Sequence, residues 1–204
     1  MDVYVSLLDA SLADQSLFSS LKAATGYHID VVDGKFVSGS TRFLRRDVLA
    51  KVPTDKPWFV HLMTKRPQDK VHRYTQAKIL AYQFEEVSND DMRSFNETLR
   101  KMNIVPCLAV HPKTAAAKIK PVLSLFSHVL ILTVPPGRSG RSFLESQLEK
   151  IKTIASWKQK VTLVVDGGVT VSRAKDLKNC GVEIVISGKH VLEDPKRIKA
   201  IKEI

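Results

Sequence analysis

The chain is poor in cysteine and has no long apolar stretches. Its two cysteines, Cys107 and Cys180, have neither the number nor the spacing of a disulfide framework or a cysteine metal site, so we expect both to serve core packing. No segment approaches the ~20 uncharged apolar residues that a membrane-spanning helix requires, and we see no secretory signal pattern. We therefore expect a cytoplasmic protein that is not embedded in a membrane.

Negative charge is also scarce, because 32 lysines and arginines face 21 aspartates and glutamates, for a net charge of +11. Such an excess favours an anionic partner. The densest basic groups, at 42–46 and 196–202, alternate with apolar residues at helical spacing, and aromatic residues, at 7%, provide no platform for stacking bases. We interpret the charge mainly as solvated helix faces. A basic barrel that binds nucleic acid or a regulatory partner is kept as the non-enzymatic alternative, on charge alone.

Apolar, β-branched runs alternate with amphipathic segments along the whole chain. We expect strands at 3–7, 27–32, 58–63, 79–84, 104–110, 128–133, 161–165 and 183–186. We expect helices at 14–24, 42–51, 68–76, 90–102, 114–126, 142–158, 172–179 and 194–201. Eight repeated units of strand and helix predict an α/β protein with a single (β/α)₈ TIM barrel domain over residues 1–204. An open doubly wound sheet is the alternative.

Four potential metal ligands lie where apolar runs end. His28 and Asp30 are two residues apart, the spacing that points side chains to the same face of a strand, and His61 and Asp166 end two further runs. Each alone has an ordinary explanation, either a turn residue or a hydrogen-bonded core histidine. A parallel barrel, however, gathers its functional groups at the C-terminal ends of its strands. Together the four residues predict a site for one divalent metal ion.

Glycine-containing segments follow three of the later strands. They are Gly137–Gly140 after the sixth strand, Gly167–Gly168 after the seventh, and Ser187–Gly188–Lys189 after the eighth. Barrels commonly bind phosphate near the ends of strands seven and eight, and glycine lets the backbone approach an anion closely. We therefore expect a phosphate site there, with simple turn geometry as the other explanation of each glycine.

Four ordered segments, at 28–37, 60–63, 132–137 and 165–168, resemble the signature segments of the ribulose-phosphate 3-epimerase family, and the resemblance extends from Ser6 to Lys189. It implies a ribulose-phosphate-binding barrel with one divalent ion, which can be zinc, iron, manganese or cobalt. It places the metal ligands at His28, Asp30, His61 and Asp166, and the acid/base pair at Asp30 and Asp166. The substrate contacts that we carry over are Ser6, His61, Met63, Gly137, Ser139, Gly140, Asp166, Gly167, Gly168, Ser187, Gly188 and Lys189.

The resemblance also implies a reaction, the 3-epimerisation of a phosphorylated ketose, with D-ribulose 5-phosphate and D-xylulose 5-phosphate as the expected pair. Two aspartates on opposite sides of a planar, metal-stabilised enediolate can remove a proton from one face and return one to the other. Members of the family form dimers and hexamers, so a homo-oligomer is expected.

Several residues depart from the family pattern. Arg138 and Arg141 stand in the loop after the sixth strand where the family has an aromatic residue and an amide, and they either close on the substrate phosphate or face solvent. Val32 and Leu132 replace two methionines, and Gln83 replaces a histidine of the fourth strand. These changes keep open another substrate, such as D-allulose 6-phosphate. A decarboxylase or aldolase-like reaction is disfavoured, because related barrels of that kind place a lysine where this chain has Val32.

Overall fold

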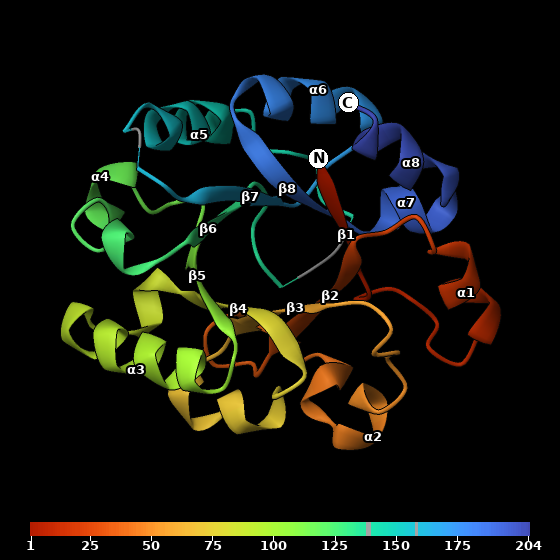
Figure 1. Cartoon of the computed structure of the whole chain (residues 1–204), viewed down its shortest axis with the longest axis horizontal. Helices are drawn as coiled ribbons and strands as arrows, with labels where there is room; N and C mark the ends of the chain where they lie inside the picture. Colours follow the sequence, from red (N-terminus) through yellow and green to blue (C-terminus); the bar gives the residue numbers. More distant parts are fainter. Residues whose placement is uncertain (138–139, 158) are drawn as a thin grey trace.

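Eight parallel strands close into a barrel in this computed structural model, which describes residues 1–137, 140–157 and 159–204. Each strand pairs with its neighbours in chain order, and β1 pairs with β8 to complete the ring (Figure 1). The strands are β1 (Asp2–Ser6), β2 (Gly26–Val32), β3 (Trp58–Met63), β4 (Ala77–Gln83), β5 (Val105–Val110), β6 (His128–Leu132), β7 (Thr162–Asp166) and β8 (Val182–Ser187). The expected TIM barrel is confirmed, and the open-sheet alternative is wrong.

Helices surround the ring of strands on its outer side (Figure 1). They are α1 (Gln15–Ser20), α2 (Arg46–Leu49), α3 (Asn89–Lys101), α4 (Ala116–Ile119), α5 (Ser146–Ser156), α6 (Val171–Asn179), α7 (Lys189–Glu193) and α8 (Lys196–Lys202). Short 3₁₀ turns complete several connections: η1 (Arg42–Leu44), η2 (Pro67–Asp69), η3 (Val71–Arg73), η4 (Phe84–Glu86) and η5 (Leu123–Leu125). In the described residues, no helix has both the length and the apolar character that crossing a membrane requires.

The helix expected at 68–76 is absent, and η2 and η3 stand in its place. Arg66 adopts a left-handed backbone with φ 48°, and Pro67 follows it, so the chain enters this connection as a turn. A 3₁₀ turn rises about 2.0 Å per residue against about 1.5 Å for an α-helix, so it spans a short connection better. The expected helices at 42–51 and 114–126 are likewise divided between short α and 3₁₀ turns, and α7 is an additional helix.

The barrel has two apolar cores, one on each face of its sheet. The outer core lies between strands and helices and includes Val3, Val5 and Ile29. The inner core fills the barrel with Tyr4, Phe59, Ile79, Ala81, Cys107, Ala109, Leu130, Leu132, Val164, Ile184 and Ile186. Because side chains alternate along a strand, the inward positions that follow these core residues fall at the C-terminal ends of the strands. On five strands these positions are polar: Ser6 on β1, Asp30 on β2, His61 on β3, Gln83 on β4 and Asp166 on β7.

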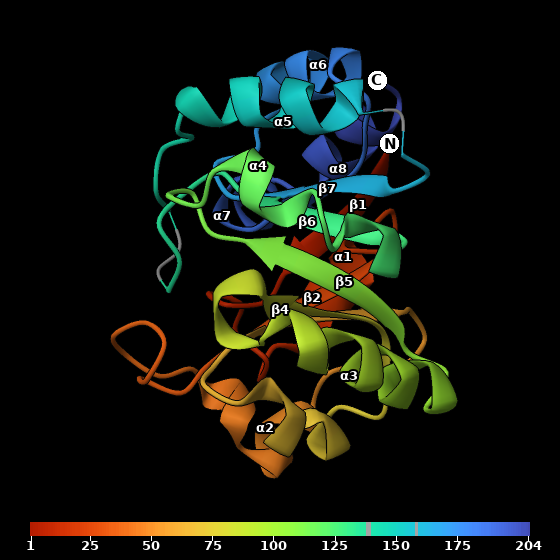
Figure 2. The ribbon, with the colours of Figure 1, turned by 90° about the vertical axis from the view of Figure 1, so that its left-hand side faces the viewer.

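The loops after β2 and β6 lie at the same end of the barrel, on the left of Figure 2, toward which the β5 arrow points. They touch each other: a Cβ built on Gly137 would lie 3.1 Å from a methyl carbon of Val37. The C-terminal end of the barrel therefore carries both the polar strand ends and a pair of loops beside them.

Candidate active site

Strands β2, β3 and β7 bring His28, Asp30, His61 and Asp166 together. Asp30 and His61 are register partners on neighbouring strands, and His28 lies two residues before Asp30 on the same face. Asp166 ends β7, on the other side of β1 and β8. One potential ligand atom from each of the four residues lies within 4.8 Å of the others. The sequence-predicted cluster thus exists as a geometric group.

The two histidines of the cluster are fully buried, and their ring nitrogens lack ordinary partners. His28 Nδ1 lies 3.2 Å from Asp30 Oδ2, and His61 Nδ1 lies 3.6 Å from Asp30 Oδ1. Within the described part of the chain, neither ring nitrogen of His28 nor Nδ1 of His61 has a hydrogen-bond partner of good geometry. Leaving buried polar atoms unpaired costs about 1–3 kcal/mol each. Imidazole nitrogens beside two carboxylates are a donor set that suits a divalent cation, so the residues fit a metal ion.

The two carboxyl groups of the cluster have opposite pKa shifts in the absence of a cation. Desolvation raises the pKa of Asp166 to about 7; the Asp30 charge adds to the shift and His28 opposes it. Burial would also raise the pKa of Asp30, but the nearby rings of His28 and His61 favour its charged form, outweigh burial and lower that pKa. Carboxyl groups that differ in this way can begin a proton transfer as one acid and one base.

The pKa values of the two histidines also diverge. Burial lowers the pKa of His28, but its attraction to Asp30 and then to Asp166 is stronger in sum and raises it. Burial lowers the pKa of His61 despite its contact with Asp30. Ser6 supports this arrangement from β1, because its Oγ donates a hydrogen bond of 3.0 Å to Asp30 Oδ2.

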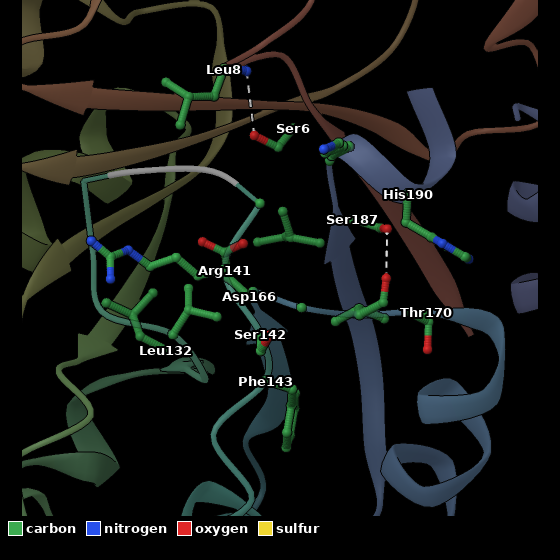
Figure 3. Close-up of a pocket in the computed structure, with 18 of the residues that line it drawn as sticks. Ser6, Leu8, Leu132, Arg141, Ser142, Phe143, Asp166, Thr170, Ser187 and His190 are labelled. Carbon is green, nitrogen blue, oxygen red and sulfur yellow. Dashed lines mark hydrogen bonds between the residues drawn. The ribbon is translucent and has the colours of Figure 1, made fainter. Parts of the chain in front are cut away.

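A cavity of about 610 Å³ opens above the cluster at the C-terminal end of the barrel (Figure 3). The expected site residues that line it are Ser6, Asp30, Met63, Gly137, Gly140, Asp166, Gly167, Gly168, Ser187, Gly188 and Lys189. His28 and His61 are fully buried and are not part of this lining. Ser139 and Arg138 lie outside the described residues. The cluster of His28, Asp30, His61 and Asp166 therefore lies at the floor of the same cavity that the three glycine segments border.

Two glycines after β7 bring neighbouring loops close to the cavity. Gly168 has φ 62°, and a Cβ at this position would lie 2.6 Å from the backbone nitrogen of Phe143, so that backbone would have to shift. Gly167 has φ 115°, and a Cβ there would meet Val134. Left-handed backbone and close contact both require glycine here. Gly167 and Gly168 therefore have the positive φ of a turn and also border the cavity, so the two explanations of these glycines do not exclude each other.

Ser187 lies inside β8, not after it as expected, because the strand extends to this residue. Its hydroxyl donates to the carbonyl oxygen of Val169 at 2.9 Å, shown by a dashed line in Figure 3. This bond ties the end of β8 to the loop that precedes α6. The side chain of Ser187 thus has a structural partner of its own.

Sequence reasoning missed part of the cavity wall. Thr170 and Arg173, at the start of α6, line the cavity with Phe143, and the Arg173 guanidinium lies 4.6 Å from the centre of the Phe143 ring. His190, to which the sequence analysis assigns no role, also lines it. No periodic signal marks these residues, but their position soon after the glycine segments that follow β6, β7 and β8 is the clue that was available. Gln83 at the end of β4 was noticed only as a departure from the family pattern.

Comparisons with known proteins agree with the geometry. The model of the "Ribulose-phosphate 3 epimerase family" matches residues 3–192. The chain is 32% identical over 202 residues to the chloroplastic ribulose-5-phosphate-3-epimerase of Arabidopsis thaliana, covering 96% of this chain and 72% of the relative. It is 28% identical over 211 residues to the ribulose-phosphate 3-epimerase of Helicobacter pylori strain J99, and the match covers 99% of this chain and 95% of the relative. The Bacillus subtilis ribulose-phosphate 3-epimerase is 28% identical, and the match covers 87% of this chain and 84% of the relative.

A solved structure shows the same fold at much lower identity. A chain in the crystal structure of the Amycolatopsis orientalis BexX/CysO complex matches with a TM-score of 0.60 and 13% identity, covering 98% of this chain and 86% of that one. That likeness concerns the barrel alone. The family match, together with the relatives named above, shows that the chain belongs to the ribulose-phosphate 3-epimerase family and is a carbohydrate epimerase of the isomerase class.

Proposed function

We propose that the chain is a metal-dependent 3-epimerase that interconverts D-ribulose 5-phosphate and D-xylulose 5-phosphate. One observation carries the proposal: Asp30 and Asp166 enter one buried cluster from non-adjacent strands, at the floor of a cavity bordered by three glycine segments. A phosphorylated ketose needs both parts, a pair of proton carriers for its carbon and a cradle for its phosphate.

His28, Asp30, His61 and Asp166 are the residues that would hold the metal ion. Two imidazole nitrogens and two carboxylates suit zinc, iron, manganese or cobalt alike. When bound, such an ion supplies stabilisation for the negative charge that develops on the ketone oxygen as the neighbouring C–H bond breaks.

Asp30 and Asp166 would carry the protons. Epimerisation removes the C3 proton from one face of the sugar and returns a proton to the opposite face of the planar enediolate. Asp30 lies on β2 and Asp166 on β7, so the two carboxyl groups approach the cavity floor from separate strands. The bond from Ser6 Oγ to Asp30 Oδ2 holds one of these carboxylates in place.

The glycine segments would bind the phosphate. One cavity is bordered by all three segments, through Gly137, Gly140, Gly167, Gly168 and Gly188. Backbone N–H groups in such turns are good hydrogen-bond donors to an anion. Arg141 and Lys189 line the same cavity and add positive charge to it.

A turnover assay tests the proposal. Purified protein loaded with Co²⁺ or Mn²⁺ is given D-ribulose 5-phosphate, and formation of D-xylulose 5-phosphate is followed with a coupling enzyme or by NMR. Conversion in both directions to the same equilibrium mixture supports the assignment. No turnover of pentulose 5-phosphates or hexulose 6-phosphates by fully loaded protein would refute the epimerase activity.

A second substrate class is D-allulose 6-phosphate. The observation that favours it is the altered cavity wall, where Leu132 takes the place of a family methionine and Arg141 that of an amide. Comparing kcat/KM for the two sugars on one metal-loaded preparation decides between them. A higher value for the hexulose phosphate would replace the pentulose as the principal substrate. The homo-oligomer and the cytoplasmic location stay predictions.

A further inference from the structure

Gln83 lies behind the candidate metal cluster and contacts one of its histidines. It ends β4, is fully buried, and its amide Nε2 lies 2.7 Å from His61 Nε2. Over residues 1–137, 140–157 and 159–204, the other amide atom, Oε1, has no hydrogen-bond partner, and neither does His61 Nδ1. Gln83 does not line the cavity, so it has no route to the substrate.

The chemistry of imidazole decides which amide atom belongs at this contact. A neutral histidine ring has one N–H and one nitrogen with a free lone pair. His61 Nδ1 faces Asp30 Oδ1 at 3.6 Å, so this is the nitrogen available to a cation in the cluster. If Nδ1 supplies the lone pair, Nε2 carries the hydrogen and needs an acceptor. Of the two amide atoms of Gln83, only the carbonyl oxygen accepts.

The amide of Gln83 meets this need by a half-turn about its last side-chain bond. The amide oxygen and nitrogen fill nearly the same space, so the half-turn exchanges them without altering the packing. The reverse arrangement would put the ring hydrogen on Nδ1. That hydrogen would point toward the cluster with Asp30 Oδ1 too far away to accept it, since 3.6 Å exceeds a normal hydrogen bond.

We propose that Gln83 is a positioning residue whose side-chain oxygen accepts a hydrogen bond from His61 Nε2 and thereby keeps Nδ1 free to bind the metal ion. The inference rests on the proposed metal centre and deepens it. A neutral acceptor suits this place, because the two carboxylates of the cluster already balance the charge of one divalent ion. Gln83 orients the ligand without adding a third negative charge to a buried site.

Cobalt binding to matched variants tests the proposal. Gln83→Met keeps the size of the side chain and removes the acceptor, whereas Gln83→Glu keeps an acceptor. Gln147→Met removes a buried amide from α5, outside the cavity, and serves as the control. Removing a hydrogen-bond partner of a metal-bound histidine typically costs 10–100-fold in metal affinity. We expect a loss of that size in Gln83→Met, and affinity at least equal to wild type in Gln83→Glu and Gln147→Met.

The d–d absorption spectrum of Co²⁺ reports affinity and ligand geometry without any activity assay. Unchanged affinity and spectrum in Gln83→Met would overturn the proposal. An equal loss in Gln83→Met and Gln83→Glu would also overturn it, because a donor or a particular shape would then be the requirement. Circular dichroism checks that each variant is folded.

A second measurement needs no variant of Gln83. Nitrogen-15 NMR of histidine-labelled wild-type protein, with the His61 signals assigned by their loss in His61→Asn, shows which ring nitrogen carries the hydrogen. We expect Nε2–H both before and after Zn²⁺ is added, and an Nδ1–H ring would overturn the inference. Wild-type protein that binds neither Co²⁺ nor Zn²⁺ would refute the proposed metal centre, while the tautomer still decides the role of Gln83.

Discussion

Replacing Asp166 with asparagine separates the two halves of the proposed reaction. Asparagine has the same shape as aspartate but can neither carry the transferred proton nor supply a negative charge to the cluster. Asp30 keeps its place, since Ser6 Oγ and His28 hold it from β1 and β2. The variant therefore retains one of the two proton carriers and the whole cavity wall.

The expected loss of turnover is large. General acid–base catalysis by one positioned group contributes about 10²–10⁴-fold, and this group also lies within 4.8 Å of the other potential ligands. We expect kcat for epimerisation to fall by about 10³-fold or more, which corresponds to about 4 kcal/mol of transition-state stabilisation. Metal content, measured on the same preparation, shows whether the cation is retained.

Hydrogen exchange in D₂O reveals the half-reaction that remains. With Asp30 as the only proton carrier, the variant should exchange the C3 hydrogen of one epimer with solvent and fail to convert it. Asp30→Asn should exchange the other epimer, because its remaining carboxyl group faces the opposite side of the sugar. Proton NMR of each pure sugar follows both events.

Two results would refute this reasoning. Near-normal epimerisation by either variant would show that the carboxyl group is not a proton carrier. Equal exchange of both epimers by one variant would show that each aspartate reaches both faces of the sugar. Asp47→Asn, an exposed carboxylate-to-amide change on α2 away from the cavity, controls for a general effect and should keep wild-type turnover.

Three further predictions concern the acidity of Asp166, the two arginines of the loop after β6, and Gly168. Because the folded pKa of Asp166, about 7, is raised above its ordinary value of 3.8, its contribution to folding is present below about pH 4 and is lost as the pH rises through 7. Between pH 5.5 and 8, chelated wild-type protein should thus lose stability to urea relative to chelated Asp166→Asn protein, which keeps the histidines whose lowered pKa acts in the opposite direction, and added metal should remove this difference; equal pH dependence of the two chelated proteins would contradict this assignment. Replacing Arg138 and Arg141 together with alanine should raise KM for the phosphorylated sugar by ~10-fold or more, the scale of one or two charged hydrogen bonds, and an unchanged KM at low ionic strength would exclude both from the site. Gly168→Ala should lower Tm by about 2–12 °C, from about 1–3 kcal/mol of strain and displaced backbone at Phe143, and should raise KM as well; a wild-type Tm in calorimetry would show that the loop yields freely.

The barrel was predictable because its strands carry a strong local signal. Buried parallel strands are continuous apolar runs, so β3, for example, was expected at the same residues that the structure shows. The connections have no comparable signal. The helix expected at 68–76 follows helical spacing, yet the backbone of Arg66 and the ring of Pro67 start a turn instead. Whether a connection forms an α-helix depends on the distance it must span, which a local pattern does not contain.

The cluster was predictable for a similar reason, and much of its surroundings was not. His28, Asp30, His61 and Asp166 each end an apolar run, and a barrel places all such ends at one rim. The contact of Gln83 with His61 depends instead on the register of β3 with β4, where His61 pairs with Ala81 two residues before Gln83. Arg173 reaches the cavity only because of where α6 starts. Such positions follow from the packing of elements.

The central claim is that one divalent ion in the cluster of His28, Asp30, His61 and Asp166 makes this chain a ketose-phosphate epimerase. The most direct test titrates chelated wild-type protein with Co²⁺ or Mn²⁺ and measures bound metal and turnover of D-ribulose 5-phosphate on the same samples. We predict that turnover rises in proportion to bound metal and reaches its plateau at about one ion per chain, as four ligands around one centre imply. Turnover that does not depend on bound metal, or none at full occupancy, would contradict the account.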